Sequence, residues 1–194
     1  RNLYLTLQLL ELGRPVVVAL NMMDEVRSHG DSIDLAGLEK GLGVPVVAIC
    51  ARKGEGIDEL VSRAMEAAEK KTVPPKLDIC DGEAHTALHA IAHLVEEEAK
   101  AHHMQPRYAA TKLFEGDKPL EEELGLSDET RHIIEEILSS MEKTVGMERA
   151  AVMADTRYRF IEKLLSTCFK RGQDEENTLT DRIDNVLTHP LLSI

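Results

Sequence analysis

Two short stretches carry side chains that could recognise the edge of a planar, polar ligand. Asn21-Met22-Met23-Asp24 follows the apolar run VVVAL, and Cys50-Ala51-Arg52-Lys53-Gly54 follows the apolar run VPVVAI. A carboxylate such as Asp24 can accept hydrogen bonds from an N–H and an NH₂ on one ligand edge, and guanine presents such an edge, whereas adenine offers the opposite pattern. Asn21 can both donate and accept, and backbone N–H groups of residues 51–53 could donate to a ring carbonyl. A site built on hydrogen bonds discriminates strongly, because the wrong ligand leaves buried polar groups unpaired.

The elements that must position these residues form an α/β unit. Alternating apolar patterns and Gly or Asp boundary residues predict a helix from about Leu3 to Gly13, a strand over 16–20, a helix over 35–42 capped by Asp34, a strand over 44–50, and a helix from Asp58 to about Lys71. Both strands are continuous apolar runs, which is typical of a parallel sheet covered on both faces. Ligands bind beyond the carboxyl ends of such strands, where both stretches lie. After Asp24 comes a short polar stretch to Asp31, to which we assign no element.

The last helix of this unit is predicted to bury an apolar stripe. Its members recur at helical spacing and are Ile57, Leu60, Val61, Ala64, Met65 and Ala68.

The region after the Pro74-Pro75 linker is predicted to contain only helices. Their expected ranges are 82–103, 106–114, about 128–145 with Ser127 as its cap, 148–171 and 181–187. We therefore predict two domains, 1–73 and 74–194. Arg157 and Arg159 are expected to form ion pairs within the chain.

Composition narrows the function further. The 194 residues carry a net charge of −12, and most of the acidic excess lies in the second region: residues 1–76 hold 10 basic and 11 acidic residues, whereas residues 77–194 hold 13 and 24. An acidic surface repels phosphate backbones, so we expect no nucleic-acid partner. Three cysteines without metal-site spacing are interpreted as reduced thiols. No apolar run approaches the roughly 20 residues that span a bilayer.

Both stretches resemble known motifs. Asn21–Asp24 and Cys50–Gly54 are similar to the fourth and fifth motifs of Ras-like GTPases, which read the guanine base. The longer sequences around these motifs resemble the cytosolic GTPase domain of the FeoB family of bacterial ferrous-iron transporters. They read NLYLTLQLLELGRPVVVALNMMDE and GVPVVAICARKGEGIDEL. In the second region, QPRYAATKLFEGD, RYRFIEKLL and TDRIDNVLTHPLL resemble the helical domain of the same family. The resemblance covers essentially the whole chain.

The resemblance implies a fold and a set of roles. It implies a partial Ras-like P-loop fold followed by a helical domain that slows GDP release. Asp24 would hold the guanine N1 and N2 hydrogens, Asn21 would contact the base and brace the loop, and Ala51 would offer its N–H. Met22 replaces the usual Lys, so that aliphatic packing on the base replaces a lysine stem, and Cys50 replaces the usual Ser, so that one hydroxyl hydrogen bond is lost. Arg52 completes the predicted set.

The sequence lacks a phosphate cradle of the type Gly-x-x-x-x-Gly-Lys-[Ser/Thr]. In the family this cradle and the switch segments precede the helix that opens this chain. We therefore expect a fragment that binds GTP or GDP weakly or not at all and does not hydrolyse GTP alone, with Mg²⁺ bound only in the complete protein. The expected partners are the rest of the GTPase domain and a transmembrane iron-permeation domain, at the cytoplasmic face of the bacterial inner membrane. Homo-oligomer formation is left open.

A row of histidines offers a different chemistry. His85, His89 and His93 recur every four residues, so their imidazoles share one helix face with Glu97. Imidazole and carboxylate ligands suit Fe²⁺, Zn²⁺ or Ni²⁺. Only neighbouring pairs in such a row can share a metal ion, and the row faces away from the apolar stripe Leu88, Ile91 and Val95. We favour a solvated polar face over a metal site.

Two other interpretations stay open. The chain could be a helical protein-interaction module on an α/β scaffold, with Asp24 serving only as a helix cap. It could also be a fragment of another Ras-like GTPase, although RNA-binding appendages of such proteins should be basic rather than acidic.

Overall fold

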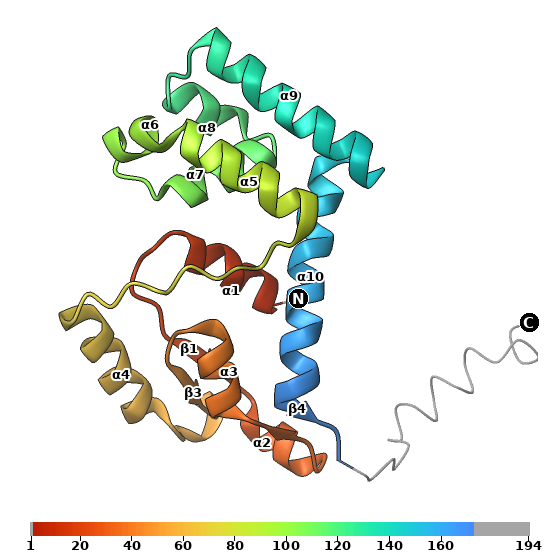
Figure 1. The fold of residues 1–194 in the computed structure, drawn as a ribbon. Coiled ribbons are helices and arrows are strands. Elements are labelled where there is room, and N and C mark those ends of the chain that lie inside the picture. The colour runs from red at the N-terminus through yellow and green to blue at the C-terminus, as the bar shows by residue number, and fades with distance from the viewer. Residues whose placement is uncertain (1, 173–194) are drawn as a thin grey trace, which may run out of the picture.

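The computed structural model describes residues 2–172, and the predicted helix over 181–187 lies outside them. The first region has α/β composition and contains α1 (Asn2–Glu11), β1 (Val18–Leu20), α2 (Met23–Ser28), β2 (Ser32–Ile33), α3 (Leu35–Leu42), β3 (Val46–Ala48), the 3₁₀ turn η1 (Ala51–Lys53) and α4 (Ile57–Glu69). An extended linker over 72–81 leads to the second region (Figure 1). That region contains α5 (Gly82–Leu94), α6 (Glu96–Ala101), α7 (Pro106–Phe114), α8 (Lys118–Glu123), α9 (Asp128–Val145), α10 (Arg149–Cys168) and β4 (Phe169–Lys170).

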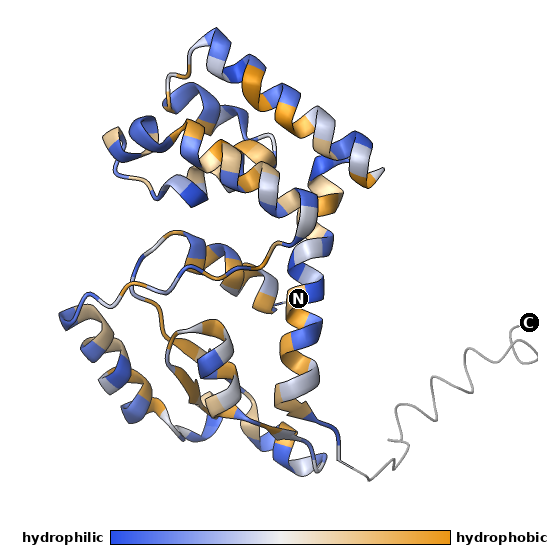
Figure 2. Cartoon of the chain, in the orientation of Figure 1, coloured by the Kyte–Doolittle hydropathy of each residue, from blue (hydrophilic) through white to orange (hydrophobic). Residues whose placement is uncertain are grey.

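The predicted parallel pairing of the two apolar strands is confirmed. β1 lies beside β3 with Val18 opposite Val46. The ladder continues past the strand ends, where the Ile49 N–H donates to the Leu20 carbonyl over 2.8 Å. Both strands are almost entirely apolar (Figure 2), as expected where helices cover a sheet. The pairing therefore brings residues 21–24 and 50–53 to one sheet edge.

Two predicted helix boundaries are confirmed in detail. At the start of α3, Asp34 Oδ1 accepts a hydrogen bond from the Gly37 N–H over 3.0 Å, and the helix ends at Gly43, whose φ of 69° is left-handed. At the start of α9, Ser127 Oγ accepts from the Thr130 N–H over 3.0 Å. These bonds satisfy backbone donors that the first helical turn leaves free.

Two stretches to which we assigned no element are helical. Residues 23–28 form α2, in which Met23 is buried and its N–H donates to the Ile49 carbonyl. The acidic run at 121–123 belongs to α8, which Asp117 caps by accepting from the Leu120 N–H over 3.2 Å. One buried residue in a polar segment is enough to fix a short helix, and periodicity over six residues does not reveal it.

Two other expectations about the second region were wrong. The predicted helix over 82–103 is split at Val95, whose φ of −108° ends α5 while its side chain is fully buried. The region is also not purely helical. After α10 the chain forms β4, which pairs antiparallel with β2 of the first region, Ser32 opposite Lys170. The Asp34 N–H extends this pairing by donating to the Cys168 carbonyl over 2.7 Å.

Helix α10 joins the two regions. It packs against α1 and α3 at one end and against α7 and α9 at the other (Figure 1). One hydrophobic core therefore runs through both regions, with Leu7 and Leu42 at one end and Ile91, Phe114 and Leu138 at the other. The predicted stripe Leu88, Ile91 and Val95 is buried in it.

The predicted burial of the α4 stripe was wrong. Val61 is 53% exposed and Met65 is 58% exposed, although their spacing is that of a buried face. On α1, Leu5 and Leu9 are likewise exposed at 58% and 44%. Amphipathic spacing predicts a face that prefers burial. Within residues 2–172, no element covers these faces of α1 and α4. In the described part of the chain, no helix is long and apolar enough to span a membrane.

Candidate functional site

The two polar stretches meet beyond the carboxyl ends of β1 and β3. Asn21 Oδ1 accepts a hydrogen bond from the Ala51 N–H over 3.1 Å. The Met23 N–H donates to the Ile49 carbonyl over 3.3 Å, which ties the start of α2 to the end of the second strand. Asn21 therefore links the two loops, and the Ala51 N–H that we expected to face a ligand donates to Asn21 in this structure.

Asp24 lies between the two loops as an ionised acceptor. Its side chain is 14% exposed and lies 3.3 Å from Arg52 Nη2 and 3.2 Å from Lys53 Nζ. Hydrogen bonding from the Cys50 side chain, followed by that from Lys53, lowers the pKa of Asp24 to about 2. The carboxylate therefore stays charged at neutral pH. Asp24 is not the cap of α2, because that position belongs to Met22.

Met22 and Cys50 flank this carboxylate in different ways. Met22 has a left-handed φ of 64° and is 51% exposed, so it presents apolar surface beside the loop. Cys50 is only 2% exposed and is a free thiol, as are Cys80 and Cys168. We expected Cys50 to cost the loop one hydroxyl hydrogen bond, but the thiol still lowers the pKa of the Asp24 carboxyl.

The loop after Cys50 is closed at its base. Cys50 and Glu55 exchange two backbone hydrogen bonds of 3.0 and 3.2 Å. Arg27 of α2 pairs with the Glu55 carboxylate over 2.8 Å. Gly56 has a φ of 75°, and a Cβ there would lie 2.3 Å from the Ala48 carbonyl oxygen, so only glycine fits. These contacts fix the base of the loop and leave its tip, residues 51–53, exposed.

All six residues predicted for the base site lie at this edge: Asn21, Met22, Asp24, Cys50, Ala51 and Arg52. Sequence reasoning missed Lys53 as a side-chain participant. Its position in the loop after the second strand was the available signal, because the loops that follow two neighbouring parallel strands lie side by side.

The histidine row lies along one side of α5, with His89 and His93 exposed and His85 half-buried. The rings of His85 and His89 are 5.7 Å apart between centroids, and those of His89 and His93 are 4.7 Å apart. Carboxylates approach its ends, with His85 Nδ1 at 3.1 Å from Asp78 and His93 Nδ1 at 3.7 Å from Glu96. Within residues 2–172, no three His, Cys, Asp or Glu side chains are arranged to hold a metal ion.

A second ionic cluster lies deep between the regions. Arg157 of α10 is 1% exposed and pairs with Glu11 of α1 over 3.1 Å and with Glu115 at the end of α7. Its Nη1 also donates to the Tyr4 hydroxyl over 3.2 Å. Burial opposes the charge of Arg157, but the two carboxylates and Tyr4 outweigh it and raise the pKa. The predicted internal pairing of Arg157 is confirmed.

Desolvation raises the pKa of Glu11, and Arg157 only partly offsets this effect. Arg159 is also paired internally, with Asp81 over 3.1 Å and Asp155 over 2.9 Å. The ion-pair partners of both arginines are therefore single carboxylates elsewhere, and not the glutamates at 96–98 or 121–123.

Comparison with known protein families gives two matches that follow one another along the chain. The family described as ferrous iron transport protein B matches residues 1–64, and the FeoB cytosolic helical domain matches residues 81–170. Among curated relatives, an Fe(2+) transport protein A/FeoB fusion protein of Porphyromonas gingivalis is 34% identical over 99% of this chain. The Fe(2+) transporter FeoB of Legionella pneumophila is 32% identical over 100% of it. The chain spans 24% of the length of each of these relatives.

Solved structures give the same result. NFeoB from S. thermophilus bound to GDP·AlF4⁻ and K⁺ superposes with a TM-score of 0.76 at 34% identity, over 84% of this chain and 63% of that one. The mGMPPNP-bound form gives a TM-score of 0.75 at 33% identity, over 89% and 64%. The Ras-like α/β fold and the helical domain are therefore both confirmed. The chain belongs to the FeoB family and comprises part of its cytosolic G domain followed by its helical domain.

Proposed function

We propose that the loops at 21–24 and 50–53 bind the guanine base of GTP or GDP. The observation that carries the proposal is the meeting of an ionised carboxylate, Asp24, with a loop whose Ala51 N–H is oriented by Asn21 over 3.1 Å. Asp24 would accept hydrogen bonds from the N1 and N2 hydrogens of guanine. The exposed Met22 side chain would pack on the face of the base.

Arg52 and Lys53 both contact Asp24 Oδ2, one of the two oxygens that would accept from the base edge. Arg52 is 83% exposed and Lys53 is 47% exposed, so both side chains can turn into solvent at little cost. Guanine would then exchange two solvent-screened ion pairs for directed hydrogen bonds. The exchange favours a ligand with two donors and disfavours adenine, which would leave the carboxylate facing an acceptor.

Phosphate binding is not assigned to any residue of this chain. The sequence lacks the Gly-x-x-x-x-Gly-Lys-[Ser/Thr] pattern. We propose that a complete G domain supplies that cradle together with Mg²⁺, and that this chain alone binds guanine nucleotides weakly and does not hydrolyse them. The exposed apolar faces of α1 and α4 support this, because a further part of the G domain would cover Leu5, Leu9, Val61 and Met65.

The helical region is proposed to regulate GDP release in a membrane-bound ferrous-iron transporter, at the cytoplasmic face of the bacterial inner membrane. The supporting feature is α10, which links α1 to α7 through Arg157 and returns to the α/β region as β4. We place the domain boundary near residue 73, in the linker before α5.

Nucleotide titration of this chain, followed by amide NMR, tests the base site. We expect GDP to shift the amides of Ala51 and Asp24 and ADP at the same concentration to leave them in place. Asp24→Ala should abolish the GDP shifts, whereas Asp58→Ala, which removes an exposed carboxylate of α4, should not. Equal shifts with GDP and ADP would instead favour the interaction-module interpretation, with no base recognition.

A further inference from the structure

The last two histidines of the row on α5 lie closer together than the first two. His89 and His93 are four residues apart on one side of the helix, and both side chains are exposed. Their ring centroids are 4.7 Å apart, whereas those of His85 and His89 are 5.7 Å apart. The two pairs therefore differ in how well one metal ion can bridge them.

The geometry of metal coordination favours the pair His89 and His93. A Zn²⁺ ion lies about 2.0–2.1 Å from an imidazole nitrogen, on the line that joins the nitrogen to the ring centre. Two rings on one ion therefore have centroids about 4.5 Å apart at a right angle and about 5.2 Å apart at a tetrahedral angle. The separation of 4.7 Å falls between these values, and 5.7 Å exceeds both. His89 and His93 can thus share an ion with the backbone of α5 as it stands.

A carboxylate lies beside the ring of His93. Glu96 Oε2 is 3.7 Å from His93 Nδ1, at the point where α5 ends and α6 begins. Glu97, which the sequence pattern placed on the same face, pairs with Lys100 over 3.2 Å. Metal-bound histidines usually direct their second nitrogen toward a carboxylate, a carbonyl or water. With Glu96 beside Nδ1, the Nε2 atom of His93 is left for the ion.

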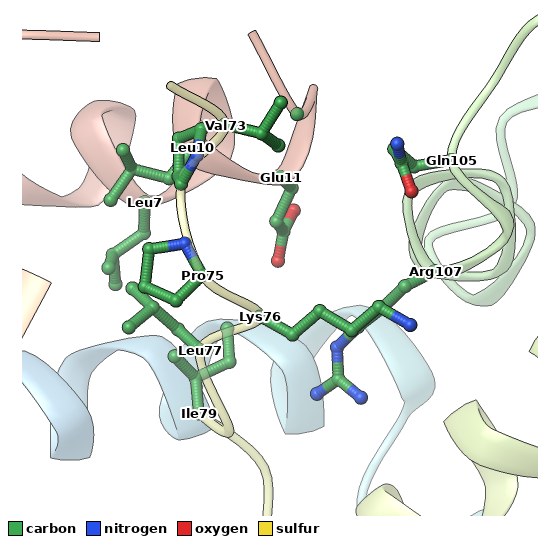
Figure 3. Close-up of a pocket in the computed structure, with 12 residues that line it drawn as sticks. Leu7, Leu10, Glu11, Val73, Pro75, Lys76, Leu77, Ile79, Gln105 and Arg107 are labelled. Carbon is green, nitrogen blue, oxygen red and sulfur yellow. The ribbon is translucent and has the colours of Figure 1, made fainter. Parts of the chain in front are cut away.

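His85 is held at the other end of the row. Its Nδ1 atom is buried and lies 3.1 Å from Asp78 Oδ1 in the linker. Arg107, which lines a cavity of about 170 Å³ between α1, the linker and α7 (Figure 3), lies 3.5 Å from the same oxygen. The carboxylate that His85 and Arg107 share keeps the His85 ring beside the linker, which agrees with its larger separation from His89.

We propose that His89 and His93 bind one divalent late first-row transition-metal ion, such as Ni²⁺ or Zn²⁺. Imidazole is a ligand for these ions, whereas Mg²⁺ prefers oxygen ligands. Within residues 2–172 no third His, Cys, Asp or Glu side chain completes the site, so water fills the other positions. The histidine face is solvated, as the sequence led us to expect, and the ion binds at its surface. A site with two protein ligands suits an exchangeable ion, because structural zinc sites have four. The proposal does not depend on guanine binding.

Isothermal titration of the untagged chain with Ni²⁺ tests the site. We expect saturable binding of Ni²⁺ and no heat of binding with Mg²⁺ at the same concentration. His89→Asn and His93→Asn should each weaken Ni²⁺ binding about tenfold or more, because even the outer partners of metal ligands contribute that much to affinity. Both side chains are exposed, so the variants should fold as the parent does. The absence of saturable Ni²⁺ binding, or equal affinity in the parent and both variants, would overturn the proposal.

Two control variants separate this pair from the rest of the row and from an isolated histidine. His85→Asn should bind Ni²⁺ as the parent does, and so should His132→Asn, which removes an exposed histidine of α9. Paramagnetic Ni²⁺ should broaden the ring signals of His89 and His93 first and leave the Ala51 amide, the reporter of GDP binding, unchanged. A loss of affinity in His85→Asn as large as that in His93→Asn would contradict the assignment to the last two histidines.

Discussion

The two ionic clusters of this chain differ in burial: the cations paired with Asp24 are exposed, whereas Arg157 is buried among α1, α7 and α10. Asp24 is paired with cations that are 83% and 47% exposed, on a loop whose tip faces solvent. Arg157 is 1% exposed and is paired with carboxylates from two other helices. Exposed ion pairs contribute little net free energy, whereas removing one partner of a buried pair leaves an uncompensated charge. The first cluster is suited to ligand exchange and the second to structural coupling.

The largest expected effect comes from Arg157. Arg157→Met should lower the free energy of unfolding by about 3–5 kcal/mol, because Glu11 and Glu115 would lose their shared cation inside the protein. Chemical denaturation measures this loss. Arg159→Met is the matched control on the same helix. Its side chain is 52% exposed, so the cost should stay below about 1 kcal/mol. Similar losses in both variants would contradict the contrast between buried and exposed pairs.

Asn21→Ala should have the next largest effect, confined to the loops around Asp24. Removing Oδ1 leaves the Ala51 N–H without its acceptor, at a cost of about 1 kcal/mol. Hydrogen exchange of the Ala51 amide should then accelerate about fivefold, while the amide of Val47 in β3 keeps its protection. GDP-induced shifts should weaken in parallel. Unchanged exchange at Ala51 would mean that Asn21 does not hold the loop.

The carboxyl groups of the two clusters should have pKa values shifted in opposite directions. The pKa of Asp24 lies near 2, below its ordinary 3.8, whereas that of Glu11 lies above its ordinary 4.5. Asp24 therefore contributes stability that is present above about pH 4 and is lost as the pH falls through 2. Glu11 binds a proton more readily in the folded state, so its own contribution to stability grows as the pH falls through its raised pKa. Carboxyl ¹³C NMR measures both values, and a shift of both in the same direction would contradict this account.

Lys53→Gln should produce the smallest change. It removes one exposed competitor for the Asp24 carboxylate, so GDP-induced shifts should saturate at a nucleotide concentration about two- to threefold lower. The stability of the protein should change by less than about 0.5 kcal/mol. Lys70→Gln, at the C-cap of α4 and away from the loop, is the control and should leave the titration unchanged. A weaker response to GDP in Lys53→Gln would show that this lysine assists the ligand instead of competing with it.

The meeting of the two polar loops was predictable from sequence, because each loop follows an apolar strand and parallel pairing brings the strand ends together. The helix caps at Asp34 and Ser127 were predictable because capping is local chemistry. The partners of Arg157 were not, because they lie 146 and 42 residues away and depend on how α1, α7 and α10 pack. Short elements such as α2 and β4 were missed because tertiary contacts rather than periodicity stabilise them. The prediction that the α4 stripe is buried failed although its helical spacing was clear, because nothing in residues 2–172 covers it.

The most direct test of the central claim changes the hydrogen-bond pattern that Asp24 presents. An asparagine at this position offers one acceptor and one NH₂ donor, which matches the N1 hydrogen and the C2 carbonyl of xanthine rather than the two donors of guanine. GDP and xanthosine diphosphate are titrated against the chain and its Asp24→Asn variant, with the Ala51 amide as the reporter. We predict that the parent responds to GDP and not to xanthosine diphosphate and that Asp24→Asn reverses this preference. A variant that keeps its preference for GDP would contradict the assignment of Asp24 as the residue that reads the base.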